Sequence, residues 1–399
     1  MGTLRTRLSR LRSAGPGSSP AVVESVEPPP AEGAFPWGER QACGPGEVRL
    51  IRECFGISHR HGQVAVGDAL AVDAMTVARL AFDPKVERVD LSRALFLDTE
   101  TTGLAGGAGT IPFLVGLGRF VDGGLEVEQL FVEGVGEEAP LLNYLRSRIE
   151  NASCIVTYNG KSYDWPLLRT RYVLNRVPMV KPRAHIDLLH AARRIYRRRL
   201  QRTRLIDLES EVLGFERVDD VGGAAIPEIY FRYLRTRDPA PLAGVLEHNV
   251  HDIVALTGIL SKLAEGYRTL RLNEDGRDRL GYAEVAERHR DHGKATRFAQ
   301  AAAEAVSGGA ECKVRARLLE ARVARRQGDV AAEAMALHMA LREAEGGWES
   351  KVHLELAKHY EHRARELPLA LKHAPFTGAA EGEVASEKRV ARLRRKLSV

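Results

Sequence analysis

Residues 95–116 read LFLDTETTGLAGGAGTIPFLVG, and this stretch decides the fold. Two acids, Asp98 and Glu100, directly follow the apolar residues 95–97. On a β-strand, side chains at positions i and i+2 point to the same face. Two neighbouring carboxylates on a buried strand repel each other and lose hydration unless a cation lies between them. The pair therefore predicts a site for a hard divalent metal such as Mg2+, although a strand end with two solvated acids is an alternative.

The glycines of residues 103–109 raise a second possibility, a phosphate-binding loop. The chain has neither the GxxxxGK[ST] pattern nor GxGxxG at this place, which disfavours a nucleotide-binding loop. We predict a tight, close-packed turn between two strands near the metal site. A backbone contact between these glycines and a substrate remains open.

Outward from this stretch, the pattern predicts a mixed sheet covered by helices. The runs RALFLD, FLVGLGRFV and LEVEQLFVE indicate an antiparallel meander of three strands. Helical spacing in residues 137–151, a strand in SCIVTYNG, a helix in residues 162–176 and a strand in RAHIDLL follow. Residues 79–93 are predicted to hold one short helix and a turn. This order is typical of an α/β domain, which we place at residues 46–266.

The two ends of the chain differ from this domain in composition. Residues 1–45 are rich in Pro, Gly, Ser and Ala and are predicted to be a disordered tail. Residues 270–375 show no strand pattern and align as helix–turn–helix units, with turn glycines Gly293 and Gly328 roughly 35 residues apart, near the tetratricopeptide period. We predict an all-α domain of tetratricopeptide-like repeats, with a plain helical bundle as the alternative. Residues 376–399 are predicted to be a basic tail.

Two further acids lie on apolar elements. Asp164 stands at the predicted start of a helix that follows a strand, and Asp252 lies in LEHNVHDIVALTGIL. His248 is four residues before Asp252 and shares its helical face. Without further information, Asp164 could be an acid that favours a helix N-terminus, and Asp252 could be a surface acid.

These segments together resemble a known family. DTETTGL, YNGKSYDWPLL and HNVHDIVAL resemble, in this order, the three motifs of the DEDD superfamily of 3′-to-5′ exonucleases, which have a ribonuclease H-like fold. The long stretch LDTETTGL…GAGTIPFLVGLG and NGKSYDWPLL are most similar to the bacterial YprB-like branch, as are the helical repeats that follow. The resemblance covers about residues 46–266. It implies a ribonuclease H-like mixed sheet flanked by helices, followed by the all-α repeat domain.

The resemblance also implies roles for individual residues. Asp98, Glu100, Asp164 and Asp252 would be the ligands of two divalent cations, Mg2+ or Mn2+. Two such cations suit phosphodiester hydrolysis by in-line displacement. His248 would position or deprotonate the attacking water, although the known subgroups place Tyr four residues, or His five residues, before the last Asp. His251 is expected to point away from the site.

Other polar residues near these motifs are candidates for supporting roles. Asp187 could support a ligand or cap a helix. Asn159 could contact the substrate strand or fix its loop, or it could be an ordinary turn residue. Seven arginines lie within residues 192–204, and Arg193, Arg194, Arg197 and Arg198 are the predicted nucleic-acid contacts. The alternative is a solvated helix, or one paired with the acids at Asp207, Glu209 and Glu211.

Composition limits the remaining function classes. The net charge is +6, which is compatible with a polyanionic partner. The four cysteines form no CxxC pair, which disfavours a zinc site or a disulfide framework. No transmembrane helix or secretory signal is predicted, so we expect a cytoplasmic protein. We predict a metal-dependent nuclease, with single-stranded DNA and RNA both open as substrates. The alternative is a non-catalytic nucleic-acid-binding scaffold that recruits a protein partner through its repeats.

Overall fold

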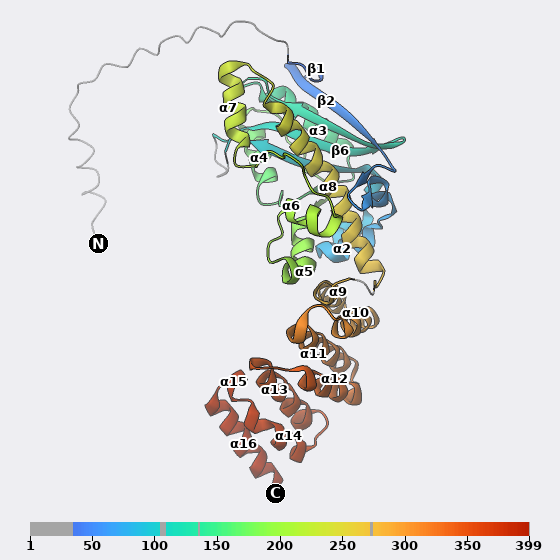
Figure 1. Ribbon diagram of the computed structural model, residues 1–399, viewed down its shortest axis with the longest axis vertical. Helices are drawn as coiled ribbons and strands as arrows, with labels where there is room; N and C mark the ends of the chain where they lie inside the picture. Colours follow the sequence, from blue (N-terminus) through green and yellow to red (C-terminus); the bar gives the residue numbers. More distant parts are fainter. Residues whose placement is uncertain (1–34, 104–108, 135, 272–273, 399) are drawn as a thin grey trace, which may run out of the picture.

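The structure is a computed structural model that describes residues 35–103, 109–134, 136–271 and 274–398. A sheet domain with covering helices lies at one end, and an all-helical region extends away from it to the C-terminus (Figure 1). The sheet has seven strands in the order β1-β2-β7-β6-β5-β8-β9. The strands are β1 (Glu39–Cys43), β2 (Gly46–Gly56), β5 (Ala94–Thr101), β6 (Pro112–Val121), β7 (Gly124–Phe131), β8 (Cys154–Thr157) and β9 (His185–Asp187).

The predicted meander and the two later strands are confirmed. β5, β6 and β7 pair antiparallel, whereas β8 and β9 join β5 in parallel, so the sheet is mixed. The helices between them are α3 (Glu138–Asn151) and α4 (Asp164–Leu174). A small second sheet pairs β3 (Arg60–His61) with β4 (Val64–Ala65). The short helices η2 (Val66–Ala71), α2 (Ala74–Ala81), η3 (Pro84–Arg88) and η4 (Leu91–Arg93) then lead into β5.

The sheet begins earlier than the sequence predicted. β1 and β2 form a hairpin whose turn contains Gly44 at φ +64°, and β2 pairs with β7. The prediction of a disordered tail is therefore wrong for β1, and the rest of that predicted tail, residues 1–34, lies outside the described residues. Gly44 and Pro45 fall within the Pro- and Gly-rich segment assigned to the tail, but they form the two-residue turn of this hairpin.

One long helix, α8 (Leu242–Arg268), crosses the sheet face that carries the acids. A Cβ atom on Gly116 would lie 2.3 Å from the Asn249 side chain, and one on Gly118 would lie 2.6 Å from Ile253. Glycine at these two strand positions thus allows α8 to lie directly on β6. Gly116 pairs with Asp98 across the strands, so the close approach brings α8 beside the acids.

The other sheet face is covered by α3. Leu95 and Leu97 of β5 belong to the same buried cluster as Leu141 and Leu145 of α3. Phe96 points to the α8 side, and Asp98 and Glu100 continue that alternation. The remaining helices of this domain are α5 (Leu188–Leu200), α6 (Leu205–Leu208), η5 (Glu209–Leu213), which is a π-helix, and α7 (Ile226–Thr236).

The C-terminal region is all helical. It contains the consecutive pairs α9 (Gly276–Arg288) and α10 (His292–Glu304), α11 (Gly309–Gln327) and α12 (Val330–Glu343), and α13 (Gly347–His362) and α14 (Leu367–His373). Gly328 ends α11 at φ +77°, as expected of a turn glycine. Gly293 lies inside α10, so its prediction as a turn residue is wrong.

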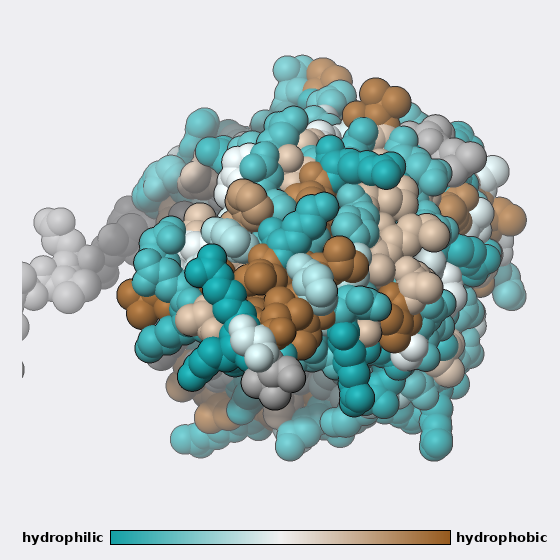
Figure 2. All heavy atoms as spheres, turned by 90° about the horizontal axis from the view of Figure 1, so that it is seen from below, coloured by the Kyte–Doolittle hydropathy of each residue, from teal (hydrophilic) through white to brown (hydrophobic). Residues whose placement is uncertain are grey.

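The predicted basic tail is part of this helical region. Residues 374–397 form η6 (Ala374–Phe376), α15 (Gly378–Glu381) and α16 (Glu383–Leu397). Leu393 of α16 is fully buried, and Arg392 pairs with Glu361 of α13 at 2.6 Å. Seen from the C-terminal end, hydrophilic side chains cover much of the surface, with apolar groups between them (Figure 2). Phe376 and Val384 are among the large apolar residues of this region that are exposed.

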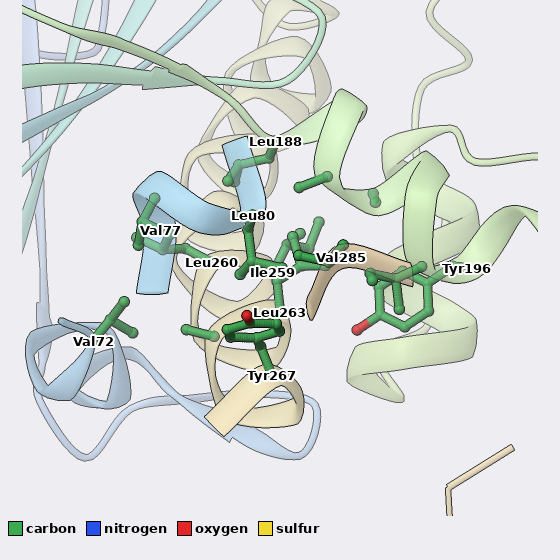
Figure 3. Packing of buried hydrophobic residues seen from close by; sticks show 14 of the residues in the cluster. Val72, Val77, Leu80, Leu188, Tyr196, Ile259, Leu260, Leu263, Tyr267 and Val285 are labelled. Atoms are coloured by element: carbon green, nitrogen blue, oxygen red, sulfur yellow. The ribbon is translucent and has the colours of Figure 1, made fainter. Parts of the chain in front are cut away.

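The two predicted domains share one core. A single buried cluster contains Phe96 of the sheet, Leu263 of α8, Tyr282 of α9 and Leu319 of α11. Tyr196, Leu263, Tyr267 and Val285 pack where the helices of both regions meet (Figure 3). In the described part of the chain all four cysteines are free, and no helix is long and apolar enough to cross a membrane.

Candidate metal centre

The first two acids lie at the end of β5, where the strand leaves its apolar run. Asp98 and Glu100 are on the α8 face, and the side chain of Glu100 is 13% exposed. The Asn249 amide of α8 donates to Asp98 Oδ2 at 3.1 Å. Gln129 of β7 in turn donates to Asn249 Oδ1 at 3.1 Å and to the Leu246 carbonyl at 2.8 Å. This chain of amides fixes one oxygen of Asp98 and leaves the other free of it.

Asp164 reaches the site from the first residue of α4. It is buried, and the Thr99 hydroxyl donates to its Oδ1 at 2.5 Å. The loop before α4 is held by Asp187, whose carboxylate accepts from the backbone N–H groups of Asn159 at 2.8 Å and Lys161 at 3.1 Å. Asp187 also caps α5 through the Leu189 N–H. The alternative of a helix cap is thus correct for Asp187, which also fixes the loop.

Asn159 is placed as a turn residue. Its φ of +65° is left-handed, a conformation that Asn tolerates better than most residues. Its backbone N–H, and not a described side-chain hydrogen bond, ties it to Asp187. The geometry therefore supports the turn-residue alternative for Asn159, whose backbone contributes to fixing the loop.

His248 and Asp252 come from consecutive turns of α8. His248 Nε2 lies 3.7 Å from Glu100 Oε1 and 3.6 Å from Asp252 Oδ2. Donor atoms of Glu100, His248 and Asp252 all lie within 4.8 Å of one another. The helical spacing of four residues therefore does direct both side chains at β5, as the sequence predicted.

The four acids are crowded and buried, and Arg217 and the imidazole of His248 are basic groups beside them. Burial, followed by repulsion from Asp252, Asp164 and Glu100, holds the pKa of Asp98 well above its usual range. Burial and Asp252 raise the pKa of Glu100 to about 7, although His248 opposes the shift. Burial raises the pKa of Asp164 to about 6 against the hydrogen bond from Thr99. Each of these shifts includes repulsion from at least one other acid of the site, so the four carboxylates interact electrostatically.

A buried arginine that sequence reasoning missed holds Asp252. Arg217 lies after η5, its side chain is 2% exposed, and its guanidinium contacts Asp252 Oδ1. The same group pairs with Glu209 at 2.6 Å and with Asp220 at 3.3 Å. Burial raises the pKa of Asp252, and Arg217 opposes that rise. A single arginine in a loop has no spacing pattern, so the sequence offered no signal for it.

His248 is oriented by a second missed residue, Asp220. His248 Nδ1 lies 2.8 Å from Asp220 Oδ1 and 3.2 Å from Arg217 Nη1. Because a carboxylate only accepts, we assign the Nδ1 hydrogen to the shorter contact with Asp220, whose second oxygen accepts from the same Arg217 nitrogen at 3.3 Å. In the neutral imidazole Nε2 then carries the lone pair, 3.7 Å from Glu100 Oε1 and 3.6 Å from Asp252 Oδ2. Burial disfavours the imidazolium, but Asp252 and Glu100 together raise the pKa of His248.

His251 does not join the acids. It lies in a separate cavity of about 490 Å3 that also contains His61 and Phe215, as expected from its place on the other side of α8.

The arginine-rich segment is only partly available. α5 ends at Leu200, and Tyr196 is buried against Tyr282 of α9. Arg198 pairs with Glu284 at 2.7 Å, Arg199 with Asp278 at 2.8 Å and Arg204 with Asp207 at 2.6 Å. Arg193 and Arg197 are exposed. The predicted pairing alternative is thus correct for Arg204, whereas Arg193 and Arg197 remain open to a ligand.

The residues at the centre fit a divalent cation. Four mutually repelling oxygen donors, one of them at the start of a helix, are the ligand set that hard cations prefer. The raised pKa values of Asp98 and Glu100 follow first from burial and then from repulsion by the neighbouring acids, and a cation among them would favour the charged carboxylates. The glycine loop of residues 104–108, for which a tight turn was predicted, lies outside the described residues.

Comparisons with known proteins agree with this geometry. A family model described as RNase_H superfamily matches residues 95–264, which run from β5 to near the end of α8. The chain is also 31% identical over 363 residues to a Bacillus subtilis (strain 168) protein described as "Uncharacterized protein YprB". That similarity covers 88% of this chain and 87% of the other. It therefore includes the helical region as well as the sheet domain.

Proposed function

The chain belongs to the YprB family and carries an RNase_H superfamily domain, and on this basis we propose that it is a metal-dependent 3′-to-5′ exonuclease. Superfamily membership by itself indicates a nuclease-like protein. The observation that supports the finer proposal is that Glu100, His248 and Asp252 lie within 4.8 Å of one another. Asp98 and Asp164 lie close enough to these acids to repel them electrostatically. Phosphodiester hydrolysis is the chemistry that such a carboxylate cluster serves best.

In this proposal, Asp98, Glu100, Asp164 and Asp252 hold two divalent cations, Mg2+ or Mn2+. Bound cations of this kind supply charge stabilisation to the scissile phosphate and lower the pKa of water. The protein contributes the fixed oxygens: Asn249 orients Asp98, Thr99 orients Asp164, and Arg217 orients Asp252. Each of these carboxylates keeps its other oxygen free of that donor.

His248 receives the proton of the attacking water in this proposal. Its Nδ1–H is fixed on Asp220, so Nε2 is the atom that accepts. The lone pair of Nε2 lies near both Glu100 and Asp252, where a water between them would be deprotonated. The two carboxylates then stabilise the imidazolium that forms.

The substrate is a single-stranded nucleic acid, with DNA and RNA both possible. Arg193 and Arg197 on α5 contact its phosphates, which gives affinity independent of sequence. We place this activity in the cytoplasm, because the four cysteines are free thiols.

The direct test uses single-stranded DNA and RNA labelled at the 5′ end, with free or blocked 3′ ends. We expect shortening from the free 3′ end with Mg2+ or Mn2+, and none after EDTA or with a blocked 3′ end. Cleavage of a circular single strand would reject the exonuclease mode. No product from any of these substrates with either metal would reject the proposed function.

A second proposal concerns the helical region. We propose that its helix pairs, α9 with α10, α11 with α12 and α13 with α14, are tetratricopeptide-like repeats that bind a protein partner. If the protein only recruits a partner, Asp98→Asn should bind that partner as tightly as the native chain does. Loss of partner binding in Asp98→Asn would show that binding depends on the metal centre and not on the repeats alone.

A further inference from the structure

An arginine-lined cavity of about 510 Å3 lies where the sheet domain meets the helical region. Its arginines come from three helices: Arg193, Arg194, Arg197 and Arg198 from α5, Arg288 from α9 and Arg315 from α11. Glu284 is the one acid among the described residues that line it. The cavity wall therefore carries a large excess of positive charge, which favours a polyanionic ligand.

Much of this charge is not neutralised within the protein. Arg198 pairs with Glu284, and Arg315 pairs with Glu311 at 2.8 Å. Within the described ranges, Arg193, Arg197 and Arg288 form no ion pair with a carboxylate, and all three are exposed. Three exposed guanidinium groups without a carboxylate partner at one cavity are available to bind an outside anion.

The remaining arginine shows how the wall is built. Arg194 donates to the Leu80 carbonyl at 2.8 Å, and its guanidinium lies over the Phe82 ring at 4.5 Å. Arg288 lies over the same ring at 5.4 Å. Phe82 thus supports one guanidinium from each region, which limits their freedom before any ligand binds.

The two sides of the cavity are fixed to each other. A Cβ atom on Gly281 of α9 would lie 2.8 Å from the Arg194 carbonyl oxygen and 2.8 Å from Ile195 Cα, so the helix backbones are in contact. Arg199 pairs with Asp278 at 2.8 Å beside this contact. The cavity is therefore a preformed feature and not a loose gap between two domains.

The cavity also lies within reach of the metal centre. α5 starts beside Asp187, which holds the loop before Asp164. At 1.5 Å per residue, Arg193 and Arg197 lie about 9 and about 15 Å along the helix axis from Asp187. A stacked strand rises roughly 3.4 Å per nucleotide, so the longer of these distances, to Arg197, corresponds to about four nucleotides.

We propose that this cavity binds the phosphates of the strand that the metal centre hydrolyses, a few nucleotides from the cleaved end. Arg288 and Arg315 of the helical region are then part of the substrate surface. Arginine suits this role because its planar fork binds phosphate oxygens in pairs. The inference rests on the proposed nuclease function and adds the helical region to it.

The test compares Arg288→Ala/Arg315→Ala with a control, Arg342→Ala/Arg235→Ala, whose arginines lie outside the cavity. Both pairs are placed in the Asp98→Asn chain, and binding of single-stranded DNA and RNA of about 20 nucleotides is measured over a range of salt concentrations. We expect the cavity variant to lower affinity by about 10-fold or more, and the slope of log K against log salt to fall by about 1.4, or about 0.7 for each phosphate contact. The control keeps the parent slope.

A second measurement separates this inference from the nuclease proposal. In the otherwise native chain, Arg288→Ala/Arg315→Ala should slow hydrolysis of the long strand and leave a dinucleotide, which cannot reach the cavity, unaffected. If the native chain cuts neither substrate, the nuclease proposal fails. The binding experiment then still tests whether the cavity arginines bind single-stranded nucleic acid.

Two outcomes overturn the cavity proposal. One is an affinity and salt slope equal to those of the control. The other is a variant that loses binding to an acidic peptide but keeps its oligonucleotide affinity, which would assign the cavity to a protein ligand. If Arg288→Ala/Arg315→Ala does not fold, Arg193→Ala/Arg197→Ala tests the same wall, because both side chains are exposed on α5.

Discussion

At the scale of single residues, one carboxylate oxygen of each aspartate in the centre accepts a hydrogen bond from another side chain of the protein. Asp98 accepts from Asn249, Asp164 from Thr99 and Asp252 from Arg217. Such donors fix the orientation of a carboxylate and set its basicity. The three aspartates could be singled out from the sequence because they lie on apolar elements and match the motifs of the exonuclease family that the chain resembles. Their donors could not, because a threonine, an asparagine and an arginine are ordinary residues until the fold places them.

Glu100 predicts a pH dependence of folding. Its pKa rises from about 4.3 in an unfolded chain to about 7 in the folded protein. Between these two pKa values the Glu100 carboxyl binds more protons in the folded state than in the unfolded chain. Its contribution to the free energy of unfolding is therefore fully present at low pH and is lost as the pH rises through this window. Glu100→Gln removes this dependence. Between about pH 5 and about pH 8, the metal-free native chain should lose on the order of 1–3 kcal/mol relative to the variant.

Urea unfolding in EDTA at both pH values measures this difference. Titrating groups far from the centre cancel in the comparison, and the difference reports Glu100 together with the repulsion that it exerts on Asp98. Parallel pH profiles for Glu100→Gln and the native chain would show that Glu100 is not in a crowded acidic site.

Arg217 gives a second prediction at this scale. Arg217→Lys keeps the positive charge but loses the fork that contacts Asp252 and Glu209 together. We expect Mn2+ affinity to fall by about 10–100-fold, as for other residues that orient metal ligands. Titration calorimetry with Mn2+ measures the effect, and Arg235→Lys, in an exposed pair with Glu228, is the matched control. An unchanged affinity in Arg217→Lys would mean that Asp252 does not depend on this contact.

At the scale of elements, the contact between α8 and β6 positions the centre. Gly116 lies between Asp98 and Gln129 in the sheet register, with Asn249 directly above it. The helix can supply Asn249, His248 and Asp252 only at this close approach. The glycines of FLVGLGRF thus serve the site through packing, a role that strand alternation alone does not reveal.

Gly116→Ala tests this contact. The added methyl group would lie 2.3 Å from the Asn249 side chain, against which α8 must shift. We expect a loss of about 1–3 kcal/mol in unfolding free energy and a fall in hydrolysis of about 100-fold, because the acids move relative to one another. Gly56→Ala is the control, since no atom lies within 4 Å of its added Cβ. Full activity in Gly116→Ala would show that the α8 position is not critical.

The elements divide into those that sequence patterns predict and those that they do not. β5 to β9, α3 and α4 have apolar periodicity or turn signals, and they lie where expected. β2 was missed because its second half, Arg52 to Cys54, faces solvent and breaks the alternation of buried residues. The sequence left the arginines of residues 192–204 open between nucleic-acid contacts and a solvated or acid-paired helix. In the structure, the face with Ile195 and Tyr196 is buried, so core packing decided their roles.

At the scale of the whole molecule, the helical region and the sheet domain are one packed body. The change in amino-acid composition at about residue 270 predicted a boundary between the sheet domain and the helical region. Such a change does not indicate whether the two regions pack against each other. Tyr196 and Tyr267, before that boundary, and Val285, after it, belong to one buried cluster and are drawn together in Figure 3. The arginine cavity lies at the same junction, so the packing that joins the regions also builds a surface from both.

The most direct test of the metal-centre nuclease is Mg2+-dependent hydrolysis of a 5′-labelled single strand by the native chain and by Asp98→Asn. Asn has nearly the same size as Asp, so circular dichroism should show an unchanged fold for this variant. The substitution removes the negative charge that the proposed metal centre needs. The account predicts 3′-end shortening by the native chain and a rate lower by more than about 100-fold in Asp98→Asn, since even residues that only orient metal ligands are worth roughly 10–100-fold. Equal rates for the two proteins, after removal of contaminating nucleases, would contradict it.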